Sequence, residues 1–112
     1  MISTVSIIIR HALGDERMAL GVRAAYAAQA GGYETTLVLF GEGVYALTGR
    51  LPEYLRNMIT SFQENDGRLA CLGYCAEQRG IAPSEFGFEG VDVLGNGELA
   101  EILEDSDSVN VF

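Results

Sequence analysis

The sequence predicts a three-layer α/β/α sandwich built on a mostly parallel five-stranded sheet. Short apolar segments rich in β-branched residues alternate with helical segments along the whole chain. Strands and helices that alternate at these lengths are typical of a parallel sheet covered by helices. The chain has 112 residues, 48% of them hydrophobic, and no linker, repeat or low-complexity segment. We therefore expect one domain spanning residues 1–112.

The first half of the chain predicts two strands and two helices. The strands span 5–9 and 35–40, which are apolar segments bounded by polar residues or glycine. A helix is expected over 16–30, which is rich in good helix formers and is followed by two glycines. This helix is apolar on nearly every side, which predicts a second contact besides the sheet. The helix over 52–64 starts at Pro52 and has apolar residues at helical spacing.

The second half predicts three more strands and two short helices. The strands span 68–72, 91–94 and 109–112, and the helices span 75–79 and 98–104. Asn96 precedes the last helix and is expected to cap it. We expect the acidic side chains in and after this helix to be solvated, with docking of a basic partner as the alternative. These side chains belong to Glu98, Glu101, Glu104, Asp105 and Asp107.

Charge and composition argue against several classes of partner. The net charge of −9 and the lack of clustered basic residues disfavour nucleic acid and anionic membrane surfaces. No apolar run approaches the ~20 residues of a membrane span. The first residues have no basic segment and no small-residue cleavage site, so we expect a cytoplasmic protein. Two cysteines and one histidine fall short of four zinc ligands, and we expect no metal or organic cofactor.

The carboxyl ends of the predicted strands gather the candidate functional residues. In a parallel sheet these ends meet at one edge, where ligands usually bind. His11 follows the first strand, Glu42 and Gly43 follow the second, and Tyr74 and Cys75 follow the third. His11 has the chemistry of a proton shuttle but is more often just exposed in a loop. Glu42 lies between two glycines, so it is equally expected to be a turn residue or a polar ligand at the site.

Cys75 is the candidate nucleophile. Cys75 is expected at the start of a short helix, where it would be partly exposed. Its thiolate would be favoured there by the helix dipole and by Arg79 one turn later. The alternative is an ordinary packed thiol beside a solvated arginine. Cys71 lies inside the third strand, where a small core side chain is expected, so it is the alternative site. A Cys71–Cys75 redox switch is a less favoured reading.

Two phenylalanines and a glycine motif complete the candidates. Phe86 and Phe88 lie in a glycine-rich stretch and predict local packing, with a lid over Cys75 or a subunit anchor as alternatives. The Gly41–Glu42–Gly43 segment lacks the Lys-Ser/Thr of a phosphate loop and the third glycine of a dinucleotide fingerprint. Nucleotide binding is therefore not expected.

Three segments resemble a known family. Phe40-Gly-Glu-Gly-Val44 is similar to the Phe-x-Asp-Gly-Val signature of the DsrE/DsrF/TusD-like proteins. Cys75-x-x-x-Arg79-Gly-Ile81 resembles the Cys-x-x-x-Arg-Gly-Ile of their YchN-like branch, and the acidic last helix with a strand ending in Phe112 resembles that branch too. The branch usually has a first cysteine at the position of Leu72, so Cys71 is displaced from it by one residue.

The resemblance implies a sulfur-relay function. It implies a compact subunit that assembles into trimers or hexamers and carries sulfane sulfur as a cysteine persulfide between donor and acceptor proteins. Cys75 matches the carrier position, with Arg79 beside it, and Cys71 stays the alternative. Whether the chain is a sulfurtransferase is left open, because some family subunits are structural partners without a functional cysteine. A non-catalytic assembly subunit is thus the alternative function.

Overall fold

The computed structural model describes residues 2–48 and 50–112, which form a five-stranded sheet in which every strand pair is parallel. The strand order across the sheet is β4-β3-β2-β1-β5. The strands are β1 (Thr4–Ile9), β2 (Glu34–Leu39), β3 (Arg68–Leu72), β4 (Asp92–Leu94) and β5 (Ser108–Val111). The predicted α/β fold and its five strands are confirmed.

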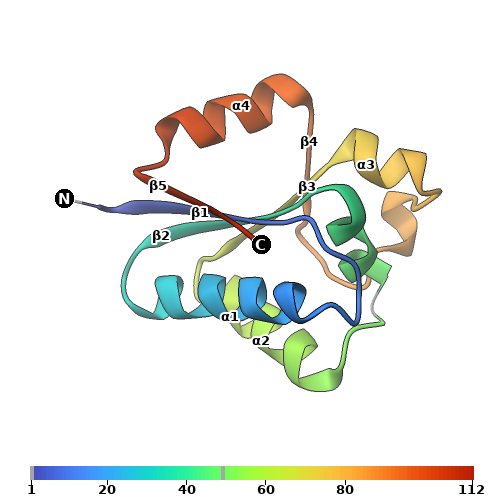
Figure 1. Ribbon diagram of the computed structural model, residues 1–112, viewed down its shortest axis with the longest axis horizontal. Coiled ribbons are helices and arrows are strands. Elements are labelled where there is room, and N and C mark those ends of the chain that lie inside the picture. Colours follow the sequence, from blue (N-terminus) through green and yellow to red (C-terminus); the bar gives the residue numbers. More distant parts are fainter. Residues whose placement is uncertain (1, 49) are drawn as a thin grey trace.

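Helices cover both faces of this sheet. Figure 1 shows α1 (Glu16–Ala30) and α2 (Glu53–Glu64) on one side and α4 (Asn96–Asp105) on the other. The short helix α3 (Gly73–Gln78) and the 3₁₀ helix η1 (Gly41–Thr48) lie together beyond the carboxyl ends of the strands (Figure 1). A one-turn 3₁₀ helix, η2 (Pro83–Glu85), follows α3. Both faces of the sheet are thus covered, while its carboxyl edge is built from short helices.

Helix α1 has the bounds expected from the sequence. Asp15 caps it, since its Oδ1 accepts a hydrogen bond from the backbone N–H of Arg17 at 2.8 Å. Gly21 allows the helix to approach β1 closely, because a Cβ there would lie 2.5 Å from the Ile9 side chain. Leu20 and Tyr26 are exposed on the same helix. The apolar character of α1 is therefore only partly used within the subunit.

The register of the strands fixes which side chains share a face. Ile9 of β1 is paired with Leu39 of β2, and Leu39 is paired with Cys71 of β3. Ile9 contacts Gly21 of α1, so all three side chains point to the face covered by α1 and α2. Each is fully buried in the hydrophobic core. Cys71 is therefore a core residue, as predicted.

Several predicted boundaries differ from the structure. The glycine segment after β2 is not a simple turn but starts η1, and α3 begins at Gly73, two residues before the predicted start. Asn96 does not cap α4; it is the first helical residue, and the backbone N–H of Gly95 donates to Glu98 Oε1 at 3.1 Å. From sequence alone, glycine-containing segments are interpreted as turns, because glycine is common in turns. Glycine can also adopt helical backbone angles, so a helix that starts at a glycine has no distinguishing signal in the sequence.

The start of β5 is fastened to the start of β1 by one carboxylate. Asp107 Oδ2 accepts hydrogen bonds from the backbone N–H and the hydroxyl of both Ser3 and Thr4, at 2.9 to 3.1 Å. These bonds lower the pKa of Asp107 from 3.8 to about 2, the backbone donors having the larger effect. The carboxylate thus holds the outer strand in place.

Candidate functional site at the carboxyl edge

Cys75 lies in the first turn of α3, directly after β3. The structure corrects the expectation that this thiol is partly exposed, since only 6% of Cys75 is accessible. The earlier start of α3 explains the difference, because it turns Cys75 and Ala76 inward and leaves Tyr74 outside. Tyr74 is 60% exposed, and its hydroxyl accepts a hydrogen bond from Gln78 at 2.8 Å. Tyr74 therefore lies on the solvent side of the helix rather than around the thiol.

Arg79 ties the thiol-bearing helix to η1. Its Nη1 donates to the carbonyl oxygen of Cys75 at 3.1 Å, and its Nη2 lies 3.6 Å from Glu42 Oε1. The buried Nε has no hydrogen-bond partner among the described residues. The structure thus brings Glu42, which is distant in the sequence, to the Cys75–Arg79 turn, with a guanidinium beside the backbone of the thiol residue.

Gly43 has a structural role in this arrangement. A Cβ at this position would lie 2.1 Å from the backbone oxygen of Ile9, so η1 can approach the end of β1 only with glycine here. Two hydrogen bonds fix the approach: Phe40 N–H donates to Ile9 and Gly43 N–H donates to Phe40, both at 2.9 Å. The close fit positions Glu42 to face Arg79.

His11 pairs with an arginine instead of the thiol. Its Nε2 lies 2.9 Å from Arg17 Nη1. A guanidinium only donates, so Nε2 accepts and the proton of the neutral ring is on Nδ1. That buried Nδ1 has no partner in the described part of the chain. Arg17 was not identified from the sequence, and the spacing of six residues between a loop and a helix gives no signal for such a pair.

The two thiols of the chain differ in their environment. Both are free cysteines. Burial, and secondarily the charge of a Cys75 thiolate, raises the pKa of Cys71 to about 11. Cys71 therefore keeps its proton at neutral pH, and a protonated thiol is a poor nucleophile.

An apolar hollow of about 530 Å³ lies between α3, β4 and η2. Ala76, Ile81, Pro83, Phe86 and Val93 supply most of its lining. Phe86 and Phe88 are both partly buried against the core, which supports local packing, and Phe86 reaches this hollow from η2. The hollow was missed in the sequence, where its residues are spread over a strand, a helix and a loop.

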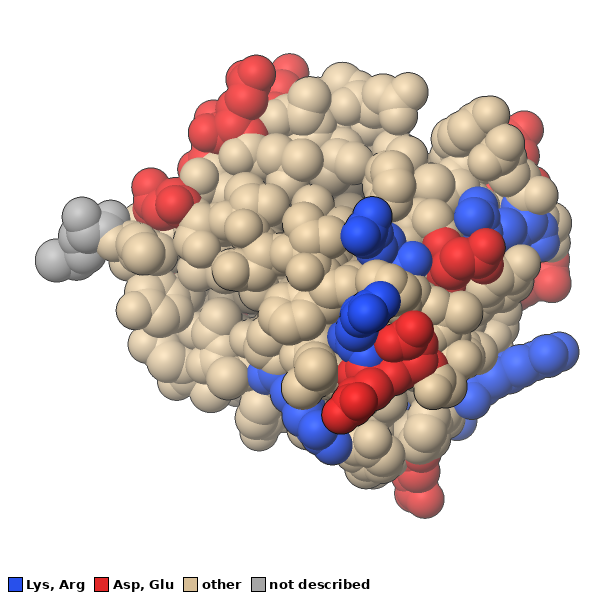
Figure 2. All heavy atoms as spheres, in the orientation of Figure 1, with Lys and Arg blue, Asp and Glu red and all other residues tan. Residues whose placement is uncertain are grey.

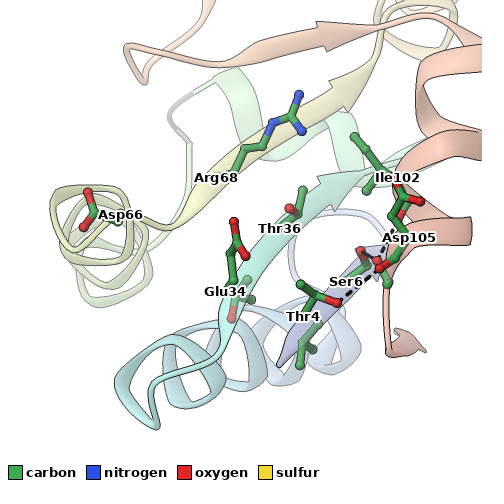
Figure 3. A pocket seen from close by; sticks show the side chains of 11 residues that line it. Thr4, Ser6, Glu34, Thr36, Asp66, Arg68, Ile102 and Asp105 are labelled. Atoms are coloured by element: carbon green, nitrogen blue, oxygen red, sulfur yellow. Dashed lines mark hydrogen bonds between the residues drawn. The ribbon is translucent and has the colours of Figure 1, made fainter. Parts of the chain in front are cut away.

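A second hollow, of about 400 Å³, lies at the amino ends of the strands, opposite the carboxyl edge. Figure 3 shows that it is polar, with Thr4, Ser6, Thr36 and Arg68 reaching into it from the starts of three strands. It contains no thiol, and the parallel strands separate it from Cys75. Within residues 2–48 and 50–112, no group of three or more His, Cys, Asp or Glu is placed to hold a metal ion. Both thiols of the chain thus lie outside this hollow.

A family model decides the identity of the fold. The model of the DsrE/DsrF-like family matches residues 4–112, nearly the whole chain. The chain belongs to the DsrE/DsrF-like family. No curated protein matches this DsrE/DsrF-like chain in a sequence search.

Solved structures agree with this family fold. The YchN protein of Escherichia coli superposes with a TM-score of 0.86 at 24% identity, covering all of both chains. MTH1491 of Methanobacterium thermoautotrophicum, a protein of unknown function, gives 0.79 at 18% identity over 98% of this chain and 99% of its own. BT1422 of Bacteroides thetaiotaomicron, also of unknown function, gives 0.74 at 15% over 98% and 95%. These TM-scores show that the DsrE/DsrF-like chain and these proteins share a fold.

Among the described residues, no helix is long and apolar enough to cross a membrane.

Proposed function

We propose that this chain is a sulfur-relay protein that carries sulfane sulfur as a persulfide on Cys75. Membership of the DsrE/DsrF-like family supports a sulfur-relay role. The observation that supports Cys75 over Cys71 is position: Cys71 is fully buried inside β3, where burial also raises the pKa of its thiol, whereas Cys75 lies in the first turn of α3 at the carboxyl edge. Cys75 in addition has the Arg79 guanidinium hydrogen-bonded to its own carbonyl group.

The proposed chemistry is an exchange at sulfur without an added oxidant. The Cys75 thiolate attacks the outer sulfur of a donor persulfide, the donor S–S bond breaks, and the donor leaves as a thiolate. In the second step an acceptor thiolate attacks the outer sulfur of the Cys75 persulfide, which restores the Cys75 thiolate. Each step forms one S–S bond and breaks one, so electrons balance. No metal or organic cofactor enters this scheme.

The burial of Cys75 sets a condition on this scheme. With 6% of the residue accessible, a donor reaches the sulfur only when α3 or η1 moves aside. The contacts that join these two short helices include the 3.6 Å pair between Glu42, which is exposed, and Arg79 at the end of α3, which is partly buried. Solvent-exposed ion pairs stabilise a structure by only about 0–1 kcal/mol, so this contact adds little to the free energy that holds α3 against η1. We infer that docking of a partner opens the edge.

The proposed partners are a sulfur donor protein and an acceptor protein in the cytoplasm, where thiols stay reduced. We further propose that the subunits assemble as a homo-oligomer, a trimer or a hexamer, or together with paralogous subunits. The exposed apolar side chains of α1 support assembly. A non-catalytic assembly subunit is the second candidate function, and the observation that favours it is the burial of Cys75.

Intact-mass spectrometry after incubation with a persulfide donor separates the two functions. The relay predicts an adduct of about 32 Da, one sulfur atom, on the wild-type chain and on Cys71→Ser. Cys75→Ser is expected to gain none, because a hydroxyl without an adjacent base is a poor nucleophile. An adduct on Cys75→Ser but not on Cys71→Ser would move the role to Cys71. If the wild-type chain gains no sulfur, the assembly subunit is the better description.

A further inference from the structure

We propose that β5 pairs antiparallel with β5 of a second copy of this chain, so that the two five-stranded sheets join into one. The paired surface does not include Cys75, and the proposal does not rest on sulfur transfer. It requires a two-fold axis perpendicular to the sheet, which places the same face of both copies on the same side.

The two edges of the sheet are protected very differently. The β4 edge is a three-residue strand whose Asp92 binds Arg68 at 2.6 Å, and a short edge with charged side chains resists pairing. The β5 edge, Ser108-Val-Asn-Val111, has no charged residue, proline or glycine. Val109 and Val111 on it are 42% and 56% exposed. An unprotected apolar edge of this kind is a template for another strand.

The backbone of β5 has the direction that such pairing needs. Phe112 bonds β1 through both backbone groups: its N–H donates to Ile8 at 2.7 Å, and its carbonyl accepts from Arg10 at 2.8 Å. Successive residues of a strand point their backbone groups to opposite sides. Val109 and Val111 therefore direct theirs away from β1. In the proposed pair, Val109 of each copy lies opposite Val111 of the other, and the two exchange reciprocal hydrogen bonds across the axis.

Helix α1 adds a side-chain contact to this backbone pairing. Ala24 and Ala28 line an apolar hollow of about 340 Å³ together with Ile7 and Phe112, between α1 and the β5 edge. Leu20 lies one turn before Ala24 on the same stripe of the helix and is 44% exposed. The two-fold axis brings the α1 stripes of both copies to the same side of the joint. This contact uses the apolar side of α1 that the subunit leaves open.

Charges at the two ends of β5 favour the antiparallel direction. Asp105 and Asp107 are exposed at its start, whereas Arg10 is exposed beside its end, hydrogen-bonded to Phe112. Figure 2 shows that, on one face, all arginines lie away from the end where the strands start, although acidic side chains lie among them, and that only acidic groups mark the end where the strands start. Antiparallel pairing sets the acidic start of one strand beside Arg10 of the other copy. A parallel arrangement would place acidic groups together instead.

The mass of the assembly in solution tests the proposal. Of the two assemblies proposed above, only the hexamer can contain this pair, so size exclusion with light scattering is expected to give a dimer or a hexamer for the wild-type chain. Val109→Lys places a charge on the pairing edge and is expected to halve that mass. Val93→Lys is the matched control, because Val93 is 46% exposed on the opposite edge, and it should leave the mass unchanged. A monomer, a trimer, or an unchanged mass for Val109→Lys overturns the proposal.

Two further measurements decide the matter if Val109→Lys fails to fold. Hydrogen exchange on the wild-type chain should show the amides of Val109 and Val111 protected at high protein concentration and exchanging fast on dilution. Arg10→Glu should raise the dissociation constant roughly tenfold, the factor expected for losing exposed ion pairs at both ends of the joint. Arg56→Glu, an exposed arginine on α2, is the control for net charge. Fast exchange at every concentration, or equal effects of the two charge reversals, overturns the proposal.

Discussion

Arg79 donates a hydrogen bond from Nη1 to the carbonyl oxygen of Cys75, across one turn at the end of α3. The same guanidinium faces Glu42 of η1, so one side chain connects the two short helices that enclose the thiol. Only 21% of the Arg79 side chain is accessible. The arginine therefore acts as a partly buried bridge rather than the solvated charge that an isolated arginine in a sequence usually indicates.

Loss of this bridge should lower stability. Arg79→Ala removes a hydrogen bond from a charged group and is expected to cost about 1.5–3 kcal/mol in the free energy of unfolding, measured by urea titration. Glu42→Gln removes only the exposed ion pair and is expected to cost less than about 1 kcal/mol. Equal losses from the two variants would show that the Cys75 carbonyl contact contributes nothing.

Gly43→Ala should disturb the carboxyl edge without touching the thiol. The added Cβ would collide with the Ile9 backbone oxygen at 2.1 Å, and overpacking of this kind costs about 1–3 kcal/mol. Gly97→Ala is the matched control, because nothing lies within 4 Å of its Cβ and α4 is helical there. Alanine in that helix should stabilise by about 0.5–1 kcal/mol. Thermal unfolding of both variants decides the comparison, and a neutral Gly43→Ala would contradict the close approach.

Asp107 should contribute to the acid stability of the chain. Its pKa is about 2 in the folded state against 3.8 ordinarily, so the folded state favours the carboxylate. The stabilisation is fully present above pH 3.8 and is lost as the pH falls toward 2. Asp107→Asn should therefore lower the midpoint of thermal unfolding at neutral pH and flatten its dependence on pH over this window. A parallel pH profile for variant and wild type would contradict this assignment.

The two cysteines should react in a fixed order. Alkylation at neutral pH followed by peptide mapping is expected to label Cys75 before Cys71, because the pKa of Cys71 is about 11 and only the thiolate reacts. Labelling of Cys75 should itself be slower than that of an exposed thiol, given its burial. Unfolding in urea is the control, since it should label both residues equally. Earlier labelling of Cys71 in the folded chain would reverse the assignment.

The sequence was sufficient to predict the fold because local pattern and tertiary position agree along most of the chain. The bounds of α1 and β3 are those expected, since glycines or polar residues end apolar segments of typical length. The location of Cys71 in the core also followed from its place inside a strand. The family match supports the same architecture.

The geometry around Cys75 could not be predicted with the same success. Whether a helix starts at Gly73 or two residues later decides which way the thiol points, and helix starts are the least certain part of a sequence-based prediction. The Glu42–Arg79 and His11–Arg17 pairs depend on how η1, α3 and the loop after β1 pack together. Such contacts between short segments leave no periodic pattern in the sequence.

The register of β3 also has a consequence for protein engineering. Cys71 points toward α1 and α2, so its neighbour Leu72 points through the sheet to the side of α4. Moving a thiol by one position along this strand therefore transfers it across the full thickness of the sheet, to a different compartment of the core. A second thiol engineered into β3 therefore lies either in the core under α1 and α2 or in the core under α4, depending on its position. Moving the cysteine from position 71 to position 72 would transfer the sulfur from the first part of the core to the second.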